Sequence, residues 1–155
     1  MLYYFIRIKH YIILLNNIMI RELKITDYYK YICLLNNFRP SNVHYNKFIN
    51  IYNSIFNNNG VVYVYLHDGQ IIGTGTLIIE EKFIHDGSKY AHIEDIFVDK
   101  NYRGKKIGRQ ILEKLIDYSK NKKCRLCKLN CDEELINYYT KSGFVLNGNC
   151  LYLIH

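Results

Sequence analysis

The sequence predicts one α/β domain in which helices flank a β-sheet of mixed direction. Strand-like apolar segments and amphipathic, helix-like segments follow one another in the order β-α-α-β-β-β-α-β-α-β. The pair Asp68-Gly69 is typical of the tight turn of a β-hairpin, so part of the sheet should be antiparallel. The length of 155 residues suits a single domain, and 49% hydrophobic content with a single proline argues against a disordered chain.

The first seventeen residues are expected to be an extension, followed by a domain that spans residues 18–155. Arg7, Lys9 and His10 interrupt the apolar run of the extension, so its apolar core is too short for a membrane-spanning helix. The run also lacks the small-residue cleavage site of a signal peptide. Met19 is an alternative start. A weak membrane or targeting role stays open, but we expect no stable membrane insertion.

One strand and two helices are predicted to open the domain. The strand covers residues 18–24, and Thr26 or Asp27 caps a helix that ends near residue 37. Pro40 breaks the chain before a second helix that ends near residue 58. Apolar residues recur on one face of each helix: Tyr28, Tyr31, Ile32, Leu35 and Phe38 in the first, and Tyr45, Phe48, Ile49, Tyr52, Ile55 and Phe56 in the second.

A hairpin and the rest of the sheet follow. Gly73 and Gly75 share one face of a predicted strand, which suggests that another group packs closely there. Gly143 is placed to end the last helix. The predicted elements are strands 61–66 and 70–79, a polar excursion at 80–89, strand 92–98, a helix that begins after the loop 103–108, strand 124–131, helix 133–142 and strand 144–154.

The loop 103–108 is predicted to bind an anion, because it leads from a strand into the first turn of a helix. Free backbone N–H groups and the positive end of the helix dipole attract negative charge there. Lys100, Arg103, Lys105, Lys106 and Arg109 surround the loop, and the formal net charge of +7 also favours an anionic partner. A solvated turn would look similar, and nucleic acid would fit the sign. The basic residues concentrate between Lys100 and Arg125 without the regularly interleaved aromatic residues of a single-strand binder, which favours a polyphosphate cofactor.

Two acids stand inside the apolar strand 92–98. Simple alternation would send Glu94 to one face of the sheet and Asp95 to the other. Carboxylates among Ile93, Ile96 and Phe97 are costly to bury unless they are paired or used. Their position beside the anion loop therefore indicates a function.

Five cysteines, Cys33, Cys124, Cys127, Cys131 and Cys150, leave zinc binding or a redox pair as possibilities to weigh. Alternation along strand 124–131 would put Cys124 on the face opposite Cys127 and Cys131, and no second ligand pair of suitable spacing is present. We therefore expect reduced structural cysteines, no metal site and a cytoplasmic protein.

Three motifs resemble the acetyl-CoA-dependent N-acetyltransferase superfamily, known as GNAT. They are the acidic strand HIEDIFV at 92–98, the loop with Arg103 followed by Gly108, and the segment YYTKSGF at 138–144. Within that superfamily, EEKFIH at 80–85 and NCDEELINYYTKSGF at 130–144 are similar to the glucosamine-6-phosphate N-acetyltransferases. The resemblance runs from about residue 18 to the C-terminus. It implies the GNAT acyl-CoA N-acyltransferase fold, with a mixed, mostly antiparallel sheet.

The resemblance also implies an acetyl-CoA site. Backbone groups of the central strand would hold the pantetheine arm, the loop amides would hold the pyrophosphate, and Tyr139 would lie near the sulfur as a general acid or hydrogen-bond donor. A core aromatic is the less favoured alternative for Tyr139, and Tyr138 is the better core candidate of the two. The cofactor-binding residues implied are Ile96, Phe97, Val98, Arg103, Gly104, Lys105, Lys106, Ile107, Gly108, Tyr139 and Lys141.

The acceptor implied is D-glucosamine 6-phosphate, and its product belongs to UDP-GlcNAc and amino-sugar biosynthesis. Lys82, Phe83, Ile84 and His85 would meet the sugar phosphate. The acids Glu94 and Asp95, together with Asn130, would meet the amine and hydroxyls, with Glu94 as proton acceptor or as an orienting group. Direct transfer in a ternary complex requires no cysteine nucleophile.

Three features depart from the family pattern. Lys106 stands where the loop usually has its middle glycine, and Asn130 stands where an acid is usual. No basic residue clearly matches the one near the C-terminus that often reaches phosphate across a dimer, and His155 is nearest to it. The family is commonly a homodimer with an exchanged C-terminal strand, which residues 150–154 could form.

Two other functions compete with this hypothesis. The chain could acetylate another amine, such as a protein N-terminus, a polyamine or an antibiotic. It could also be a non-catalytic module that binds acyl-CoA or nucleic acid.

Overall fold

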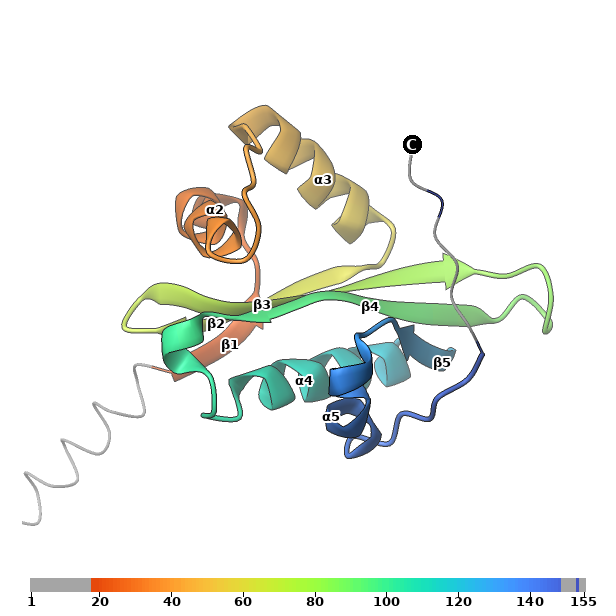
Figure 1. Ribbon diagram of the computed structural model, residues 1–155. Coiled ribbons are helices and arrows are strands. Elements are labelled where there is room, and N and C mark those ends of the chain that lie inside the picture. The colour runs from red at the N-terminus through yellow and green to blue at the C-terminus, as the bar shows by residue number, and fades with distance from the viewer. Residues whose placement is uncertain (1–17, 149–152, 154–155) are drawn as a thin grey trace, which may run out of the picture.

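A five-stranded sheet is the centre of the computed structural model, which describes residues 18–148 and 153 (Figure 1). Its strands lie in chain order, and every neighbouring pair is antiparallel except the last, which is parallel. This arrangement confirms the prediction of an α/β fold with a mixed, mostly antiparallel sheet. The strands are β1 (Ile18–Glu22), β2 (Val61–His67), β3 (Gln70–Glu81), β4 (Lys89–Val98) and β5 (Cys124–Leu129).

Helices cover both faces of the sheet. Helices α2 (Tyr28–Asn36) and α3 (Tyr45–Asn57) lie on one face, while α4 (Ile107–Asn121) and the short α5 (Ile136–Thr140) lie on the other (Figure 1). Short 3-10 helices precede α2, α4 and α5: η1 (Ile25–Asp27), η2 (Lys100–Tyr102) and η3 (Glu133–Leu135). Each face of the sheet thus closes its own apolar core, one against α2 and α3 and one against α4.

Two glycines of β3 let α4 pack directly onto the sheet. A Cβ atom at Gly75 would lie 2.8 Å from Ile111 Cγ2 and 2.9 Å from Leu115 Cδ1. A Cβ atom at Gly73 would lie 3.0 Å from Ile111 Cδ1. The prediction that another group packs closely on these glycines is therefore confirmed, and the group is the apolar face of α4.

A β-bulge interrupts β4 at the two acids. Glu94 pairs with Thr76 of β3 and Phe97 pairs with Thr74, so Asp95 and Ile96 together oppose the single residue Gly75. Asp95 has a positive φ of 52°, which marks the extra residue.

The bulge falls on the two acids, so the simple alternation predicted for Glu94 and Asp95 is interrupted there. Glu94 faces the α2 side together with its pairing partner Thr76, and it is half-buried. Asp95 is exposed at the bulge, and its charge is one influence on Tyr31, which is buried on the α2 side. Burial raises the pKa of Tyr31, a hydrogen bond with Thr74 opposes that rise, and Asp95 adds to it. Neither acid is therefore buried in the core.

The C-terminal prediction is only partly correct. The predicted helix 133–142 exists as η3 and α5, and Gly143 follows with a positive φ of 90°. The predicted strand 144–154 is absent from residues 144–148, which run without regular structure. Residues 149–152, 154 and 155, including Cys150 and His155, lie outside the described residues, as does the extension 1–17.

Irregular pairing also changes the predicted faces of the cysteines. The register between β4 and β5 shifts after Lys89, and Cys124 and Cys127 both pack against the core on the α4 side. Cys124 and Cys127 are therefore not on opposite faces. Within the described residues, every cysteine is a free thiol and no helix is long and apolar enough to cross a membrane.

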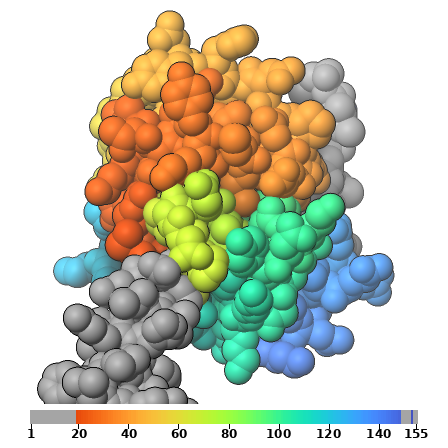
Figure 2. Space-filling model, turned by 90° about the vertical axis from the view of Figure 1, so that its left-hand side faces the viewer, coloured from red at the N-terminus to blue at the C-terminus, as the bar shows by residue number. Residues whose placement is uncertain are grey.

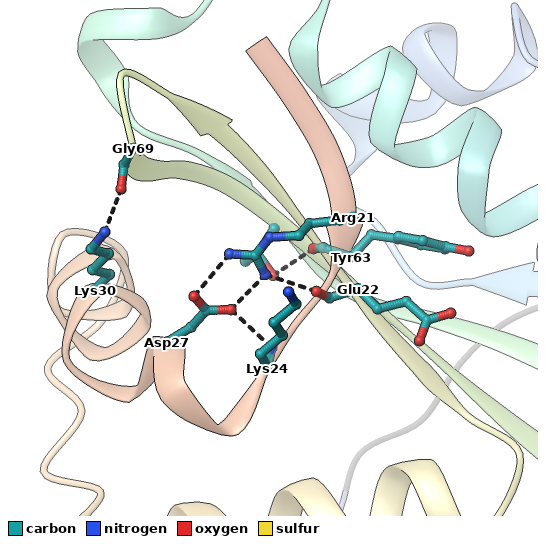
Figure 3. Close-up of polar contacts among 8 residues, drawn as sticks. Arg21, Glu22, Lys24, Asp27, Lys30, Tyr63 and Gly69 are labelled. Carbon is teal, nitrogen blue, oxygen red and sulfur yellow. Dashed lines mark hydrogen bonds and ion pairs between the residues drawn. The ribbon is translucent and has the colours of Figure 1, made fainter. Parts of the chain in front are cut away.

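A bidentate ion pair fixes β1 to the start of α2 (Figure 3). Arg21 Nη1 and Nη2 lie 2.6 and 2.9 Å from the two carboxylate oxygens of Asp27, and the Lys24 N–H donates to Asp27 Oδ2 at 2.9 Å. Asp27 stands where the sequence predicts a helix cap, but its buried carboxylate bonds backward to Arg21 and Lys24. Lys30 of α2 also donates to the Gly69 carbonyl at 2.7 Å, and Figure 2 shows this β2–β3 turn on the surface between α2 and the segment leading into α4.

The Asp27 ion pair predicts a pH-dependent stability. The hydrogen bond from Arg21 lowers the pKa of Asp27 against the opposing effect of burial. This stabilisation is fully present above the unfolded pKa of about 3.9 and is lost as the pH falls through the lower folded pKa. Asp27→Asn should lower the free energy of unfolding at pH 7 by about 2 kcal/mol and flatten its fall below pH 5. Urea unfolding at several pH values measures both effects. Glu22→Gln removes an exposed carboxylate of the same strand and should change neither.

Candidate functional site

The central opening of the molecule lies where β4 and β5 part. Their parallel pairing ends at Ile93 and Leu129, although β4 continues to Val98. Residues Glu94 to Val98 therefore present backbone groups along an edge that β5 does not cover. An uncovered strand edge can accept an extended ligand as an additional strand.

A groove of about 920 Å³ follows this edge down to the start of α4. Phe38 of the α2 end, Tyr138 and Leu135 close its sides. Nine of the predicted cofactor-binding residues line it: Ile96, Phe97, Val98, Arg103, Gly104, Lys106, Ile107, Gly108 and Tyr139. Lys105 and Lys141, which were also predicted, are exposed and do not line the groove.

The loop at the base of the groove leaves the first turn of α4 open. No described side chain caps α4, so the N–H groups of Ile107, Gly108 and Arg109 face the groove without a helical partner. A Cβ atom at Gly108 would lie 3.1 Å from the Tyr138 hydroxyl, so a larger residue would crowd this wall. The Arg103 side chain returns to β4 and donates from Nε to the Val98 carbonyl at 3.1 Å. These features suit a phosphate-bearing ligand.

Lys106 adopts the left-handed conformation that glycine would take at the same place. Its φ of 61° and ψ of 14° make it the N-cap of α4, and Gly104 also has a positive φ of 79°. The lysine therefore carries the backbone strain of the αL region, but the loop keeps the form that leaves the amides open. The replacement of the usual glycine by Lys106 therefore strains the backbone but leaves the loop open to a ligand.

Lys106→Gly should raise the free energy of unfolding by up to about 1 kcal/mol, because glycine removes the αL strain but adds unfolded-state entropy. Lys105→Gly is the matched control: it removes the same charge from the neighbouring residue, whose φ is not positive. Urea unfolding should show a loss of stability for Lys105→Gly. Equal losses in both variants would contradict the strain at Lys106.

Tyr139 lines the groove next to the open edge of β4. Burial raises its pKa to about 12, with further contributions from Tyr138 and Cys131. Its ring packs edge-on against Tyr138 at 5.0 Å and lies 6.0 Å from Phe144. The phenol thus stays protonated at physiological pH and can donate a hydrogen bond into the groove. Tyr138 is half-buried and also lines the groove, so it is not purely a core residue.

The predicted acceptor residues lie outside this groove, in two groups at opposite ends of β4. Glu94 and Asp95 stand at the bulge, and Asn130 is exposed one residue after the last pair of β5. Lys82, Phe83, Ile84 and His85 lie at the distant end, on the connection from β3 to β4. Phe83 and Ile84 point into solvent there. The structure therefore separates a cofactor-like groove from a polar sheet face, and the two meet at the bulge.

Sequence reasoning missed three members of this polar face: Glu80, Tyr90 and His92. The Lys82 ammonium pairs with the Glu80 carboxylate, and His92 Nε2 lies 2.8 Å from Glu80 Oε2. Hydrogen bonds from Lys82 and then His92 lower the pKa of Glu80. The signal was available, because residues 90, 92 and 94 alternate onto one face of β4 before the bulge.

Cysteine and metal chemistry find little support among the described residues. Burial raises the pKa of the Cys127 thiol to about 11, which disfavours a thiolate nucleophile. No group of three described His, Cys, Asp or Glu side chains is arranged to hold a metal ion.

Comparisons with known proteins agree with this geometry. A family model described as the acetyltransferase (GNAT) family matches residues 19–144. The chain is 40% identical to the glucosamine 6-phosphate N-acetyltransferase of Arabidopsis thaliana over 48% of this chain and 50% of that protein. It is also 40% identical to glucosamine 6-phosphate N-acetyltransferase 1 of Dictyostelium discoideum over 51% of this chain and 50% of that protein. The matched region thus spans about half the length of these curated relatives.

The match to solved structures is longer. The crystal structure of glucosamine-6-phosphate N-acetyltransferase from Arabidopsis thaliana aligns with a TM-score of 0.82 at 31% identity, covering 88% of this chain and 97% of that chain. The resemblance noted in the sequence is therefore confirmed at the level of family and fold.

Proposed function

Because this chain belongs to the GNAT family of acetyltransferases, we propose that it acetylates the amine of D-glucosamine 6-phosphate with acetyl-CoA. The transfer is direct, in a ternary complex, and it gives N-acetylglucosamine 6-phosphate for UDP-GlcNAc and amino-sugar biosynthesis. One observation carries the proposal: beyond Ile93 the edge of β4 is open, with a groove on one side and a polar face on the other. The named relatives supply the identity of the acceptor.

The groove residues hold the acetyl donor in this proposal. Backbone groups of Ile96, Phe97 and Val98 bond the extended pantetheine arm as an added strand. The open amides at the start of α4 and the positive charge of Arg103 hold the pyrophosphate. The thioester then lies beside the bulge.

The reaction joins the acceptor nitrogen to the acetyl carbon and breaks the carbon–sulfur bond of the thioester. A backbone N–H at the bulge stabilises the oxyanion, an effect typically worth about 10²–10³ in rate. Glu94 accepts a proton from the acceptor ammonium, directly or through water, while Asp95 and Asn130 orient the acceptor. Tyr139 donates a hydrogen bond to the departing sulfur, and the second proton that the nitrogen loses as the amide forms passes to that sulfur through water. Since the pKa of Tyr139 is about 12, well above that of a thiol, stabilising the thiolate is the main role of this residue rather than full proton transfer.

The acceptor lies on the polar face with its amine at the bulge. Lys82 and His85 attract its phosphate at the far end of the strands. We further propose a homodimer completed by the C-terminal residues, and a cytoplasmic location in keeping with free Cys33, Cys124, Cys127 and Cys131.

A substrate panel tests the proposed function. Purified protein with acetyl-CoA should release free thiol rapidly with glucosamine 6-phosphate and far more slowly with glucosamine, spermine, an aminoglycoside or a peptide N-terminus. Faster turnover of one of the other amines would show that this amine, not glucosamine 6-phosphate, is the preferred acceptor. Binding of CoA without thiol release from any amine would indicate a non-catalytic module.

Tyr139→Phe tests the thiolate contact. Removal of one hydroxyl donor should lower kcat by about tenfold or more, while the KM for acetyl-CoA changes little. Tyr29→Phe removes an exposed hydroxyl from α2 and serves as the control. An unchanged kcat in Tyr139→Phe would remove this residue from the mechanism.

A further inference from the structure

The ring of Tyr90 is the meeting point of three basic side chains on the polar face. Lys82 Nζ lies 5.1 Å and Lys128 Nζ lies 6.0 Å from the centre of this ring. The His85 ring stacks on it with a centroid distance of 6.2 Å. We name Lys82, His85, Tyr90 and Lys128 the Tyr90 cluster. Its members come from β4, β5 and the β3–β4 connection, so only the folded sheet brings them together.

The charges around this cluster are not equally available. Lys82 already pairs with the Glu80 carboxylate, which also accepts a hydrogen bond from His92. Lys128 makes no ion pair and no side-chain hydrogen bond with any residue in the described part of the chain. An incoming phosphate would therefore compete with Glu80 for Lys82 but would meet the ammonium of Lys128 uncommitted.

Lys128 also has a suitable position relative to the bulge. It pairs with His92 in the parallel register and stands two residues before Asn130. Glu94 lies four residue steps beyond Tyr90 along the strand, a distance of about 13 Å at about 3.3 Å per step. The seven bonds from the amine to the phosphorus of an aminohexose 6-phosphate span roughly 8 Å. Side chains reaching inward from both ends close the remaining gap, so an amine at Glu94 puts the phosphate near the Tyr90 cluster.

We propose that Lys128, supported by the ring of Tyr90, is the specificity-determining cation that selects a phosphomonoester on the acceptor. This inference rests on the proposed function and extends it to a residue that the sequence motifs do not include. Tyr90 holds the two ammonium groups near its face by cation–π attraction. Lys82 and Lys128 together keep a net charge of +1 once Glu80 is counted, and a phosphate of about −1.5 to −2 charges at pH 7 more than offsets it, so loss of the Lys128 charge would leave the phosphate without net compensation.

Kinetics of Lys128→Gln, Lys128→Arg and Lys114→Gln test the assignment. Lys114 is an exposed lysine of α4, on the opposite side of the sheet, so Lys114→Gln removes an equal charge at a distance. Lys128→Gln should raise the KM for glucosamine 6-phosphate about tenfold or more, while kcat, the KM for acetyl-CoA and kcat/KM for unphosphorylated glucosamine stay within about twofold. Lys128→Arg should restore most of the KM. Equal KM values for glucosamine 6-phosphate in Lys128→Gln and Lys114→Gln would overturn the inference but leave the proposed function intact.

A binding measurement distinguishes failure of the proposed function from failure of the Lys128 assignment. If the wild-type protein does not acetylate glucosamine 6-phosphate, the proposed function fails, and the cluster is tested with inorganic phosphate alone. With CoA present at saturation to occupy the loop 103–108, phosphate should raise the Tm of the wild type and of Lys114→Gln but not that of Lys128→Gln. The same phosphate-dependent shift in all three proteins would overturn the anion site at Lys128.

Discussion

The central strand β4 keeps only part of its possible hydrogen bonds, and the rest of the molecule depends on this constraint. Its pairing with β5 stops at Ile93, and its pairing with β3 is interrupted where Asp95 and Ile96 oppose Gly75. A strand that gives up ladder bonds in the middle of a sheet loses stability unless something else pairs with it. An extended ligand can do so, and this is why the groove, the open helix start and the acids all meet at one point.

Helix α4 connects the core to this opening. Its apolar face packs on Gly73 and Gly75 of β3, and its first turn forms the base of the groove. Close packing fixes the direction of the helix axis, so the free amides at its N-terminus point along the groove rather than into solvent. Lys106 keeps a left-handed conformation at this junction, which indicates that the path of the loop matters more than the local conformational preference of a lysine.

The two faces of the sheet divide the charges of the site between them. The α4 side offers backbone amides and Arg103. These groups suit a polyphosphate, whatever other groups the ligand carries. The α2 side beyond the helices offers Glu94 at the bulge and basic groups around Tyr90, at opposite ends of the same strands. A ligand with an amine at one end and a phosphate at the other matches that separation of charge. The Arg21–Asp27 ion pair lies away from these residues. It connects β1 to the start of α2.

The sequence by itself determined the order of the elements as far as α5, the hairpin, the close packing at Gly73 and Gly75, and the position of the loop 103–108 before α4. These features depend on local periodicity and turn chemistry, which neighbouring residues encode. Only the tertiary structure revealed the bulge at Glu94 and Asp95, because a bulge interrupts the alternation of a strand and depends on the pairing with the neighbouring strand. The same holds for the shared face of Cys124 and Cys127, which follows an irregular register with β4. The convergence of Lys82 and Lys128 on Tyr90 requires three segments distant in the chain to pair side by side, and no spacing within any one of them carries that information.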